Sequence, residues 1–201
     1  MPSRVDPSLI PDAPNLSLEQ ALWRQHLARI AGLDEAGRGA WAGPVVAAAV
    51  IFRSSEIPLI NTVKIRDSKQ LTPLERTDAA TVIKQTALDW GVGFTSCNEI
   101  DQFGILPATR LAMARALQAL RQPPDHLVID ALFLPDLDLP QTALLKGDQR
   151  SLSIAAASIL AKTARDEWMI KLDEQEPAYG FCRHKGYGTK LHQDALKPHG
   201  P

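Results

Sequence analysis

Four acidic side chains follow short apolar runs that are expected to form strands: Asp34, Glu35, Asp130 and Asp148. Ligand sites of α/β proteins collect at strand ends, so acids from separate strands can meet there. Carboxylates that meet repel one another, and divalent cations relieve that repulsion. Oxygen ligands alone favour Mg²⁺ or Mn²⁺ over zinc. The pattern indicates a two-metal site for phosphoryl chemistry, with ions ~3.5–4 Å apart, but spacing alone does not establish that the acids converge.

The segment around the first acidic pair is rich in glycine and reads Gly-Leu-Asp-Glu-Ala-Gly-Arg-Gly over residues 32–39. It is a near miss for the phosphate-binding loop Gly-x4-Gly-Lys-[Ser/Thr], because Arg38 and Gly39 replace the lysine and the hydroxyl residue. A strand rather than a helix is expected after Pro44, so no helix N-terminus is available to hold phosphate. The segment therefore argues against a nucleoside triphosphate site.

The composition is that of one ordinary globular domain. The chain has 201 residues, of which 45% are hydrophobic and 22% charged, which excludes a largely disordered chain or a coiled coil. The longest apolar stretch, residues 40–52, is shorter than the ~20 residues of a membrane span. No basic-then-apolar leader opens the chain, and Cys97 and Cys182 form no CxxC pair. We expect a cytoplasmic protein with free thiols and no membrane partner.

The charge is balanced overall but uneven along the chain. There are 22 Lys and Arg against 23 Asp and Glu, for a net charge of −1, which taken alone argues mildly against a nucleic-acid binder. Segment 183–201, however, holds a single acid, Asp194. Its basic and histidine residues are Arg183, His184, Lys185, Lys190, His192, Lys197 and His199. This segment is a candidate contact for a polyanion.

Apolar patterning and turn residues predict alternating strands and helices. The expected strands cover 29–33, 45–52, 90–95, 126–130 and 142–145, and the expected helices cover 73–88, 106–120 and 151–169. Thr72, Pro73 and Glu75 form a helix-start signature with a capping box, and Ser17 is expected to cap a further short helix. The alanine-rich helix 151–169 is expected to pack closely on the sheet. The order of elements predicts a mixed α/β sheet.

A set of motifs in fixed order resembles the bacterial ribonuclease HII family. They are segment 32–39 with Gly-Pro-Val-Val-Ala at 43–47, Asp-Ser-Lys-Gln-Leu at 67–71, Ile129-Asp130, Lys-Gly-Asp at 146–148, Ala-Ala-Ser-Ile-Leu-Ala-Lys at 156–162, Arg165-Asp166 and His-Lys-Gly-Tyr at 184–187. The resemblance covers residues 28–200. It implies a ribonuclease-H-like mixed β-sheet flanked by helices, with a C-terminal helical region. The expected parts are an N-terminal arm over 1–28, a catalytic domain over 29–176 and a basic substrate-contacting segment over 177–201.

The resemblance also implies an activity. Members of this family are endonucleases that hydrolyse the RNA strand of RNA–DNA hybrids and nick 5′ of single ribonucleotides embedded in duplex DNA. The expected chemistry uses two divalent ions, Mg²⁺ or Mn²⁺, and leaves 5′-phosphate and 3′-hydroxyl ends. We expect the protein to act as a monomer on nucleic acid.

The family's functional residues transfer onto matching positions of this chain. The metal-binding and catalytic acids are Asp34, Glu35, Asp130 and Asp148. The loop that reads the ribose 2′-hydroxyl consists of Gly37, Arg38 and Gly39. The tyrosine that stacks at the ribonucleotide–DNA junction is Tyr187. The phosphate or structural contacts are Lys69, Ser158 and Lys162.

Three departures from the family pattern and several open assignments accompany the resemblance. The chain stops at His199-Gly200-Pro201, short of the basic tail of many relatives, which is expected to weaken the electrostatic grip on the duplex more than the chemistry. Gly188 stands where proline is usual, and Ala155 stands where serine is common. Trp41 lies within the reading loop and either packs, which we favour, or contacts substrate. Asp166 is expected either to form a local ion pair or to support the residues that bind the metal. The histidines His184, His192 and His199 are expected to be solvated or to face phosphate.

Two other function classes were weighed against the nuclease of RNA–DNA hybrids. Another nuclease of the same superfamily, such as a junction resolvase, is disfavoured by the Gly-Arg-Gly loop combined with the downstream Lys-Gly-Tyr. A catalytically silent hybrid-binding module would be expected to lack one of the four acids. All four are present, so the enzyme is the leading hypothesis.

Overall fold

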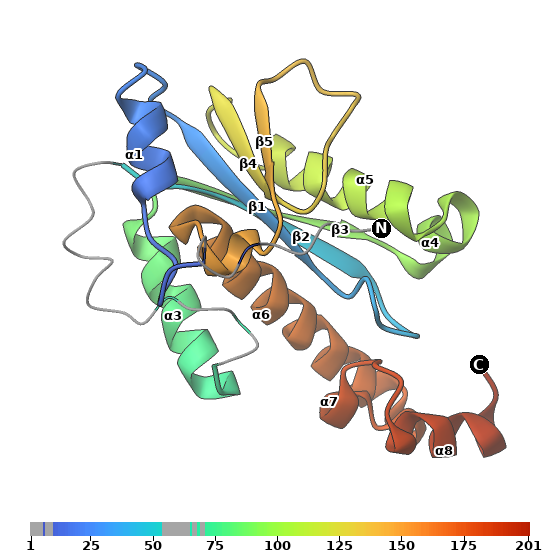
Figure 1. The fold of residues 1–201 in the computed structure, drawn as a ribbon. Helices are drawn as coiled ribbons and strands as arrows, with labels where there is room; N and C mark the ends of the chain where they lie inside the picture. The colour runs from blue at the N-terminus through green and yellow to red at the C-terminus, as the bar shows by residue number, and fades with distance from the viewer. Residues whose placement is uncertain (1–5, 7–9, 54–64, 66–67, 69–70) are drawn as a thin grey trace.

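The computed structural model describes residues 6, 10–53, 65, 68 and 71–201. Its centre is a five-stranded sheet in the order β3-β2-β1-β4-β5. The strands are β1 Ile30–Ala36, β2 Val45–Ile51, β3 Asp89–Thr95, β4 His126–Asp130 and β5 Gln141–Leu144. β2 is antiparallel to both β1 and β3, whereas β4 is parallel to β1 and to β5. The mixed sheet predicted from the sequence is confirmed (Figure 1).

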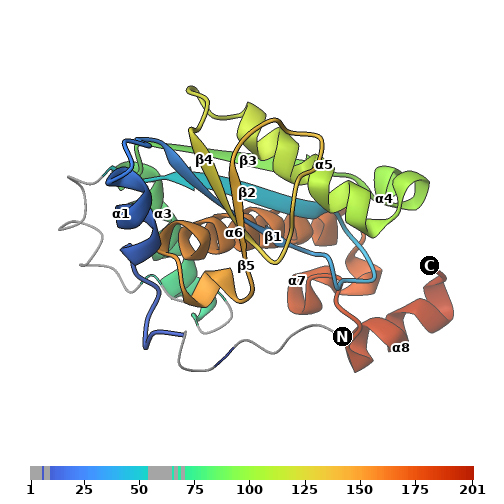
Figure 2. The ribbon, with the colours of Figure 1, turned by 45° about the horizontal axis from the view of Figure 1, so that its top comes forward.

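Helices cover both faces of this sheet. They are α1 Ser17–Trp23, α3 Pro73–Thr86, α4 Cys97–Phe103, α5 Ile105–Gln118, α6 Leu152–Gln175, α7 Phe181–His184 and α8 Lys190–His199, with 3-10 turns η4 Gly147–Gln149 and η5 Pro177–Tyr179. α3 and α6 lie on one face and α4 and α5 on the other, while α7 and α8 extend from the end of α6 (Figures 1 and 2). Among the described residues, no helix is long and apolar enough to span a bilayer.

The long helix α6 packs unusually close to β1. A Cβ added to Gly32 would lie 2.2 Å from the backbone carbonyl carbon of Ser153, so only glycine fits at this crossing. Alanines 155, 156, 157 and 161 of α6 are fully buried in the same core as Ala48 and Val50 of β2. Small side chains on the helix allow the backbones to approach, as the alanine-rich sequence predicts.

Strand alternation decides which β1 side chains face α6. Gly32 touches α6, and Ala36 belongs to the core cluster that α6 forms. Leu33 instead packs with Met113 of α5 on the opposite face. Because successive side chains of a strand point to opposite faces, Asp34 shares the α6 face with Gly32 and Ala36.

Helix starts show where local signals succeed and where they mislead. The capping box of α3 is present, with the Glu75 amide donating to Thr72 Oγ1 and the Glu75 carboxylate accepting from the Thr72 amide. The expected Ser17 cap is wrong, because Ser17 is already helical and its amide donates to Asn15 Oδ1 at 2.9 Å.

Two helix boundaries also differ from the expectation. The segment expected to be one helix from 106 is preceded by α4, which has its own Ser96/Glu99 capping box and ends at Gly104 with φ of 82°. The Ser-x-x-Glu pattern was the signal that could have revealed α4. Helix α6 continues beyond Met169 to Gln175, and it packs against η5 and α7.

Candidate active site

The register of β1 and β4 places two of the four acids on neighbouring strands. Leu33 of β1 pairs with Ile129 of β4 in parallel register, so Asp34 and Asp130 are the next residues along. Val128 packs with Ile154 of α6, which assigns the even-numbered side chains of β4 to the α6 face. Asp34 and Asp130 therefore share one face at neighbouring positions of two adjacent strands. Asp34 lies inside β1, which runs on to Ala36, and not beyond the strand as the sequence suggested.

The electrostatics of Asp34 show that negative charge is crowded there. Its side chain is buried, with 6% of the residue exposed. Burial raises the pKa of Asp34 well above its ordinary value, and the charges of Glu35 and Asp130 raise it further. Hydrogen bonds from Ser158 and from the Glu35 amide, the latter 2.7 Å long, oppose this effect. The three carboxyl groups thus act on one another across β1 and β4.

Asp148 reaches this region through the turn that precedes α6. The Gly147 amide donates to Asp130 Oδ1 at 2.7 Å, and Asp148 itself is buried in η4. A Cβ on Gly147 would lie 2.7 Å from Ile154 Cδ1 and 3.3 Å from the Asp130 Cα, so the turn packs closely against both α6 and β4. The hydrogen bond from Gly147 therefore ties the Lys-Gly-Asp turn, which includes Asp148, to the side chain of Asp130.

The donors fit a hard divalent cation. Among the described residues, no three or more His, Cys, Asp or Glu side chains form a ready-made metal cage. Mg²⁺, however, retains several waters and commonly takes only one or two protein carboxylates. Oxygen donors and the crowded charge at Asp34 suit such an ion, and Asp34 and Asp130, which lie on one face of adjacent strands, would hold it.

Neutralising Asp34 should stabilise the metal-free protein. An acid whose pKa is higher in the folded state contributes stability at acid pH, and this contribution disappears as pH rises through the folded-state pKa. Asp34→Asn should therefore raise Tm at neutral and mildly alkaline pH and flatten the dependence of Tm on pH. Calorimetry in a metal chelator measures this, with Asp138→Asn, an exposed acid outside the group, as control. A lower Tm for Asp34→Asn at neutral pH would contradict the crowding.

The two glycines of the Gly-Arg-Gly loop have different surroundings. Gly37 has φ of 102°, and a Cβ there would lie 2.3 Å from Arg165 Nε. Its carbonyl accepts from the Ala40 amide at 3.0 Å, which closes a turn. Gly39 has no atom within 4 Å of its Cβ position. Gly37 is thus required by the protein's own packing, whereas Gly39 leaves open space beside Arg38, whose guanidinium is 3.6 Å from Glu35 Oε1.

Arg165 joins this loop to the C-terminal segment. The side chain is fully buried in α6, and burial lowers the pKa of its guanidinium. Nε donates to the Pro44 carbonyl at 2.9 Å, Nη2 to the Ala42 carbonyl at 2.9 Å and Nη1 to the Lys185 carbonyl at 2.8 Å. The sequence showed Arg165 only as part of a motif, since nothing local reveals that three distant carbonyls converge on it.

Tyr187 lies over two cations of α6. Lys162 Nζ is 5.1 Å and Arg165 Cζ 5.2 Å from the centre of its ring, distances at which cations attract an aromatic face. Lys162 also forms an ion pair with Asp166 at 2.7 Å. The structure thus brings Tyr187 and Lys162 together, and it gives Asp166 the local ion pair that was one of its two alternatives, with Arg76 as a second partner at 3.8 Å.

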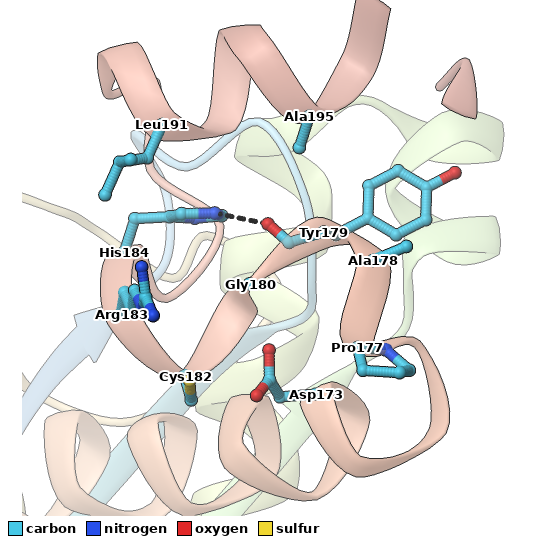
Figure 3. Close-up of a pocket in the computed structure, with 10 residues that line it drawn as sticks. All are labelled: Asp173, Pro177, Ala178, Tyr179, Gly180, Cys182, Arg183, His184, Leu191 and Ala195. Carbon is cyan, nitrogen blue, oxygen red and sulfur yellow. Dashed lines mark hydrogen bonds between the residues drawn. The ribbon is translucent and has the colours of Figure 1, made fainter. Parts of the chain in front are cut away.

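The expectation that the C-terminal histidines are solvated or face phosphate is wrong for two of them. His184 and His192 are buried, with their rings stacked 4.5 Å apart. His184 Nε2 bonds to the Tyr179 carbonyl (Figure 3), its Nδ1 accepts from the Gly186 amide, and His192 Nδ1 bonds to the Tyr187 carbonyl at 3.1 Å. These contacts shape the chain around Tyr187. His199 is exposed, as expected.

The remaining predicted contacts have mixed outcomes. Ser158 is buried and its hydroxyl is 2.9 Å from that of Ser68, beside Asp34. Lys69 lies outside the described residues. Ala155, which stands where serine is common in the family, is fully buried in the core. A cavity of about 330 Å³ lies between α6, α7 and α8 (Figure 3), but none of the four acids lines it.

Replacing Arg165 should weaken the fold strongly. Arg165→Lys retains the charge but has a single nitrogen in place of a planar fork, so buried carbonyls lose donors at ~1–3 kcal/mol each. Urea unfolding should show a loss of at least ~2 kcal/mol in the free energy of unfolding. Arg115→Lys is the control, because Arg115 also bonds a carbonyl, that of Phe94, but on the far face and partly exposed. If both variants lost the same free energy of unfolding, the idea that Arg165 joins the loop to the C-terminal segment would be wrong.

A mixed sheet with helices on both faces, and acids at neighbouring positions of β1 and β4, is the architecture of the ribonuclease-H-like class. Solved structures agree. A ribonuclease H2 from Pyrococcus horikoshii superposes with a TM-score of 0.69 at 27% identity, covering 86% of this chain and 89% of that one. The RNase HII of an Archaeoglobus fulgidus complex with PCNA superposes with a TM-score of 0.70 at 27% identity, covering 85% and 87%.

Sequence comparisons identify the family. The profile of the Ribonuclease HII family matches residues 31–200. The chain is 53% identical over 189 residues to the Ribonuclease HII of Chloroflexus aurantiacus, covering 94% of this chain and 89% of the relative. It is 52% identical over 183 residues to that of Moorella thermoacetica, covering 91% and 87%. The chain belongs to the ribonuclease HII family, whose members are endonucleases that cleave RNA in RNA–DNA hybrids, and the resemblance noted from the motifs is confirmed.

Proposed function

We propose that this protein cuts the RNA strand of RNA–DNA hybrids and nicks 5′ of single ribonucleotides embedded in duplex DNA. The observation that carries the proposal is the proximity of Asp34 and Asp130, which follow the paired residues Leu33 and Ile129 and, with Glu35, crowd negative charge directly before the Gly-Arg-Gly loop. The same loop is tied through Arg165 to the segment of Tyr187. Acids and recognition segments thus belong to one connected unit.

The acids have the role of holding divalent cations. Asp34, Glu35, Asp130 and Asp148 are proposed to bind two ions, Mg²⁺ or Mn²⁺. When bound, these ions supply an activated water and neutralise charge on the phosphate, so that hydrolysis leaves 5′-phosphate and 3′-hydroxyl ends. The buried position of Asp34 supports this role, because an ionised buried carboxylate needs a compensating positive charge.

The Gly-Arg-Gly loop is proposed to distinguish RNA from DNA. The ribose 2′-hydroxyl both donates and accepts hydrogen bonds, and DNA lacks it. The open space at Gly39 lets a sugar approach the backbone of Arg38 and Gly39. Arg38 is partly exposed and can bond phosphate with its planar fork. Lys69, Ser158 and Lys162 remain proposed phosphate or structural contacts.

Tyr187 is proposed to mark the ribonucleotide–DNA junction. Its ring is fixed by Lys162 and Arg165 on one side and by the hydrogen bonds of its backbone to His184 and His192. A fixed aromatic face is suited to packing on one sugar, and the phenol hydroxyl can bond a phosphate.

Two further proposals concern the state of the protein in the cell. The sequence of one chain carries all four acids, the Gly-Arg-Gly loop and Tyr187, and we propose that it acts as a monomer. Cys97 and Cys182 are exposed free thiols, which suits a reducing compartment, and we propose a cytoplasmic location.

Removing the charge of one central acid should abolish cleavage without unfolding the protein. The substrate is a DNA duplex with one ribonucleotide, incubated with and without Mg²⁺, and the cut is mapped on a sequencing gel. Asp34→Asn and Asp130→Asn should each lower turnover by orders of magnitude, because the ions lose a ligand. Asp138→Asn is the matched control. Near-normal cleavage by either variant, or a wild-type protein that leaves this duplex intact with Mg²⁺, would reject the assignment.

Alanine at the two loop glycines should separate folding from recognition. Gly37→Ala should lower Tm as well as cleavage, because its Cβ collides with Arg165 and the conformation is left-handed. Gly39→Ala should keep the wild-type Tm, since its φ lies outside the left-handed region and the space is open. Its cleavage should nevertheless fall at least tenfold, about 1.4 kcal/mol, because the methyl group occupies the sugar's place. Full activity of Gly39→Ala would show that no sugar approaches there.

A further inference from the structure

Trp41 is a large aromatic side chain exposed beside the proposed active site. It lies in the loop between β1 and β2, and 59% of it is accessible to solvent. A large apolar side chain that is left exposed next to a binding site is informative, whereas scattered exposed residues need no explanation. The sequence alone favoured packing for this residue.

The Trp41 backbone is held in place despite this exposure. The amides of Trp41 and Ala42 both donate to the Gly186 carbonyl, at 2.9 and 3.2 Å, and Arg165 binds the Ala42 carbonyl. Immobilising a side chain on binding costs entropy. A ring that is already positioned by its backbone avoids part of that cost, so this geometry suits a contact surface.

The ring covers Gly188, the residue where the family usually has proline. A Cβ on Gly188 would lie 2.4 Å from Trp41 Cε2, so the indole occupies the volume that a side chain at 188 would take. Its centre is 5.9 Å from that of His192. These contacts account for one side of the ring and leave more than half of the residue open to solvent.

The contacts of Trp41 place it next to Tyr187. Gly186 and Gly188 are the two chain neighbours of Tyr187, and Trp41 touches both. Lys162 stands over the Tyr187 ring, and Arg38 is exposed in the same loop as Trp41. The exposed indole thus lies beside the segment of Tyr187 and in the same loop as Arg38, and aromatic rings near cationic side chains bind nucleic acids without reading their sequence.

We propose that Trp41 contacts the substrate, its open face packing on a sugar of the duplex adjacent to the sugar that Tyr187 meets. This inference rests on the proposed function and adds a specific binding residue to it. Trp41 then contributes affinity for the duplex, and the close fit of the indole on Gly188 is what aims the ring outward.

The experiment compares Trp41→Leu with Trp41→Phe. Leucine has the bulk to cover Gly188 but no flat ring, whereas phenylalanine keeps a ring. Kd is measured by fluorescence anisotropy on a labelled duplex containing one ribonucleotide, in a chelator that prevents cleavage. Trp41→Leu should raise Kd at least about fivefold, the lower end for one aromatic stack. Trp41→Phe should stay closer to the wild type. Trp168→Phe, a partly exposed tryptophan of α6, is the matched control.

A second measurement tests direct contact. Adding unlabelled duplex should quench intrinsic tryptophan fluorescence in the wild type and in Trp168→Phe, and the quench should be lost in Trp41→Phe. Wild-type affinity in Trp41→Leu at unchanged Tm would show that the ring only packs, and a quench that persists in Trp41→Phe would overturn the contact. These results are distinct from failure of the proposed function, in which the wild-type protein with Mg²⁺ leaves the ribonucleotide-containing duplex uncut.

Discussion

The close crossing of α6 over β1 is the constraint on which the rest of the structure depends. At Gly32 the helix backbone approaches so closely that no side chain fits between the two elements. This contact fixes the height of α6 above the sheet along its whole length. Ser158 of α6 consequently reaches Asp34. One turn further along the helix, Lys162 contacts the ring of Tyr187. Arg165 contacts both Tyr187 and the loop between β1 and β2. A single helix thereby aligns the acids with the recognition segments.

The buried acids of the candidate site destabilise the metal-free fold, and the packing of the core opposes this effect. Burying Asp34 beside Glu35 and Asp130 disfavours the ionised form, so the acids destabilise the metal-free fold at neutral pH. The alanine-rich core beneath them offsets this cost through close packing. The repulsion between these carboxylates favours binding of a divalent cation, because the positive charge of the ion would reduce that repulsion.

Arg165 joins the β1–β2 loop to the segment of Lys185 through hydrogen bonds to backbone carbonyls. Its guanidinium donates to three backbone carbonyls, and its planar fork can serve all three at once where lysine could not. The Gly37 conformation exists because this side chain fills the space behind it. Trp41 and Tyr187 then project from the two segments that Arg165 connects, so the spacing of the proposed substrate contacts is set from inside the protein.

The sequence by itself determined the mixed sheet, the capping box of α3 and the identity of the acids, because strand patterns and caps are local and the family motifs are linear. The prediction missed α4, although its Ser-x-x-Glu start is a local signal, and it misplaced the start of α1, where Ser17 is already helical. Only the tertiary structure decided that His184 and His192 are buried, that Arg165 binds three carbonyls and that Trp41 is exposed. Arg165 and Trp41 join the β1–β2 loop to residues more than 100 positions away, and such contacts leave no periodicity in the chain. The two histidines are buried because α7, α8 and the turn between them fold onto one another.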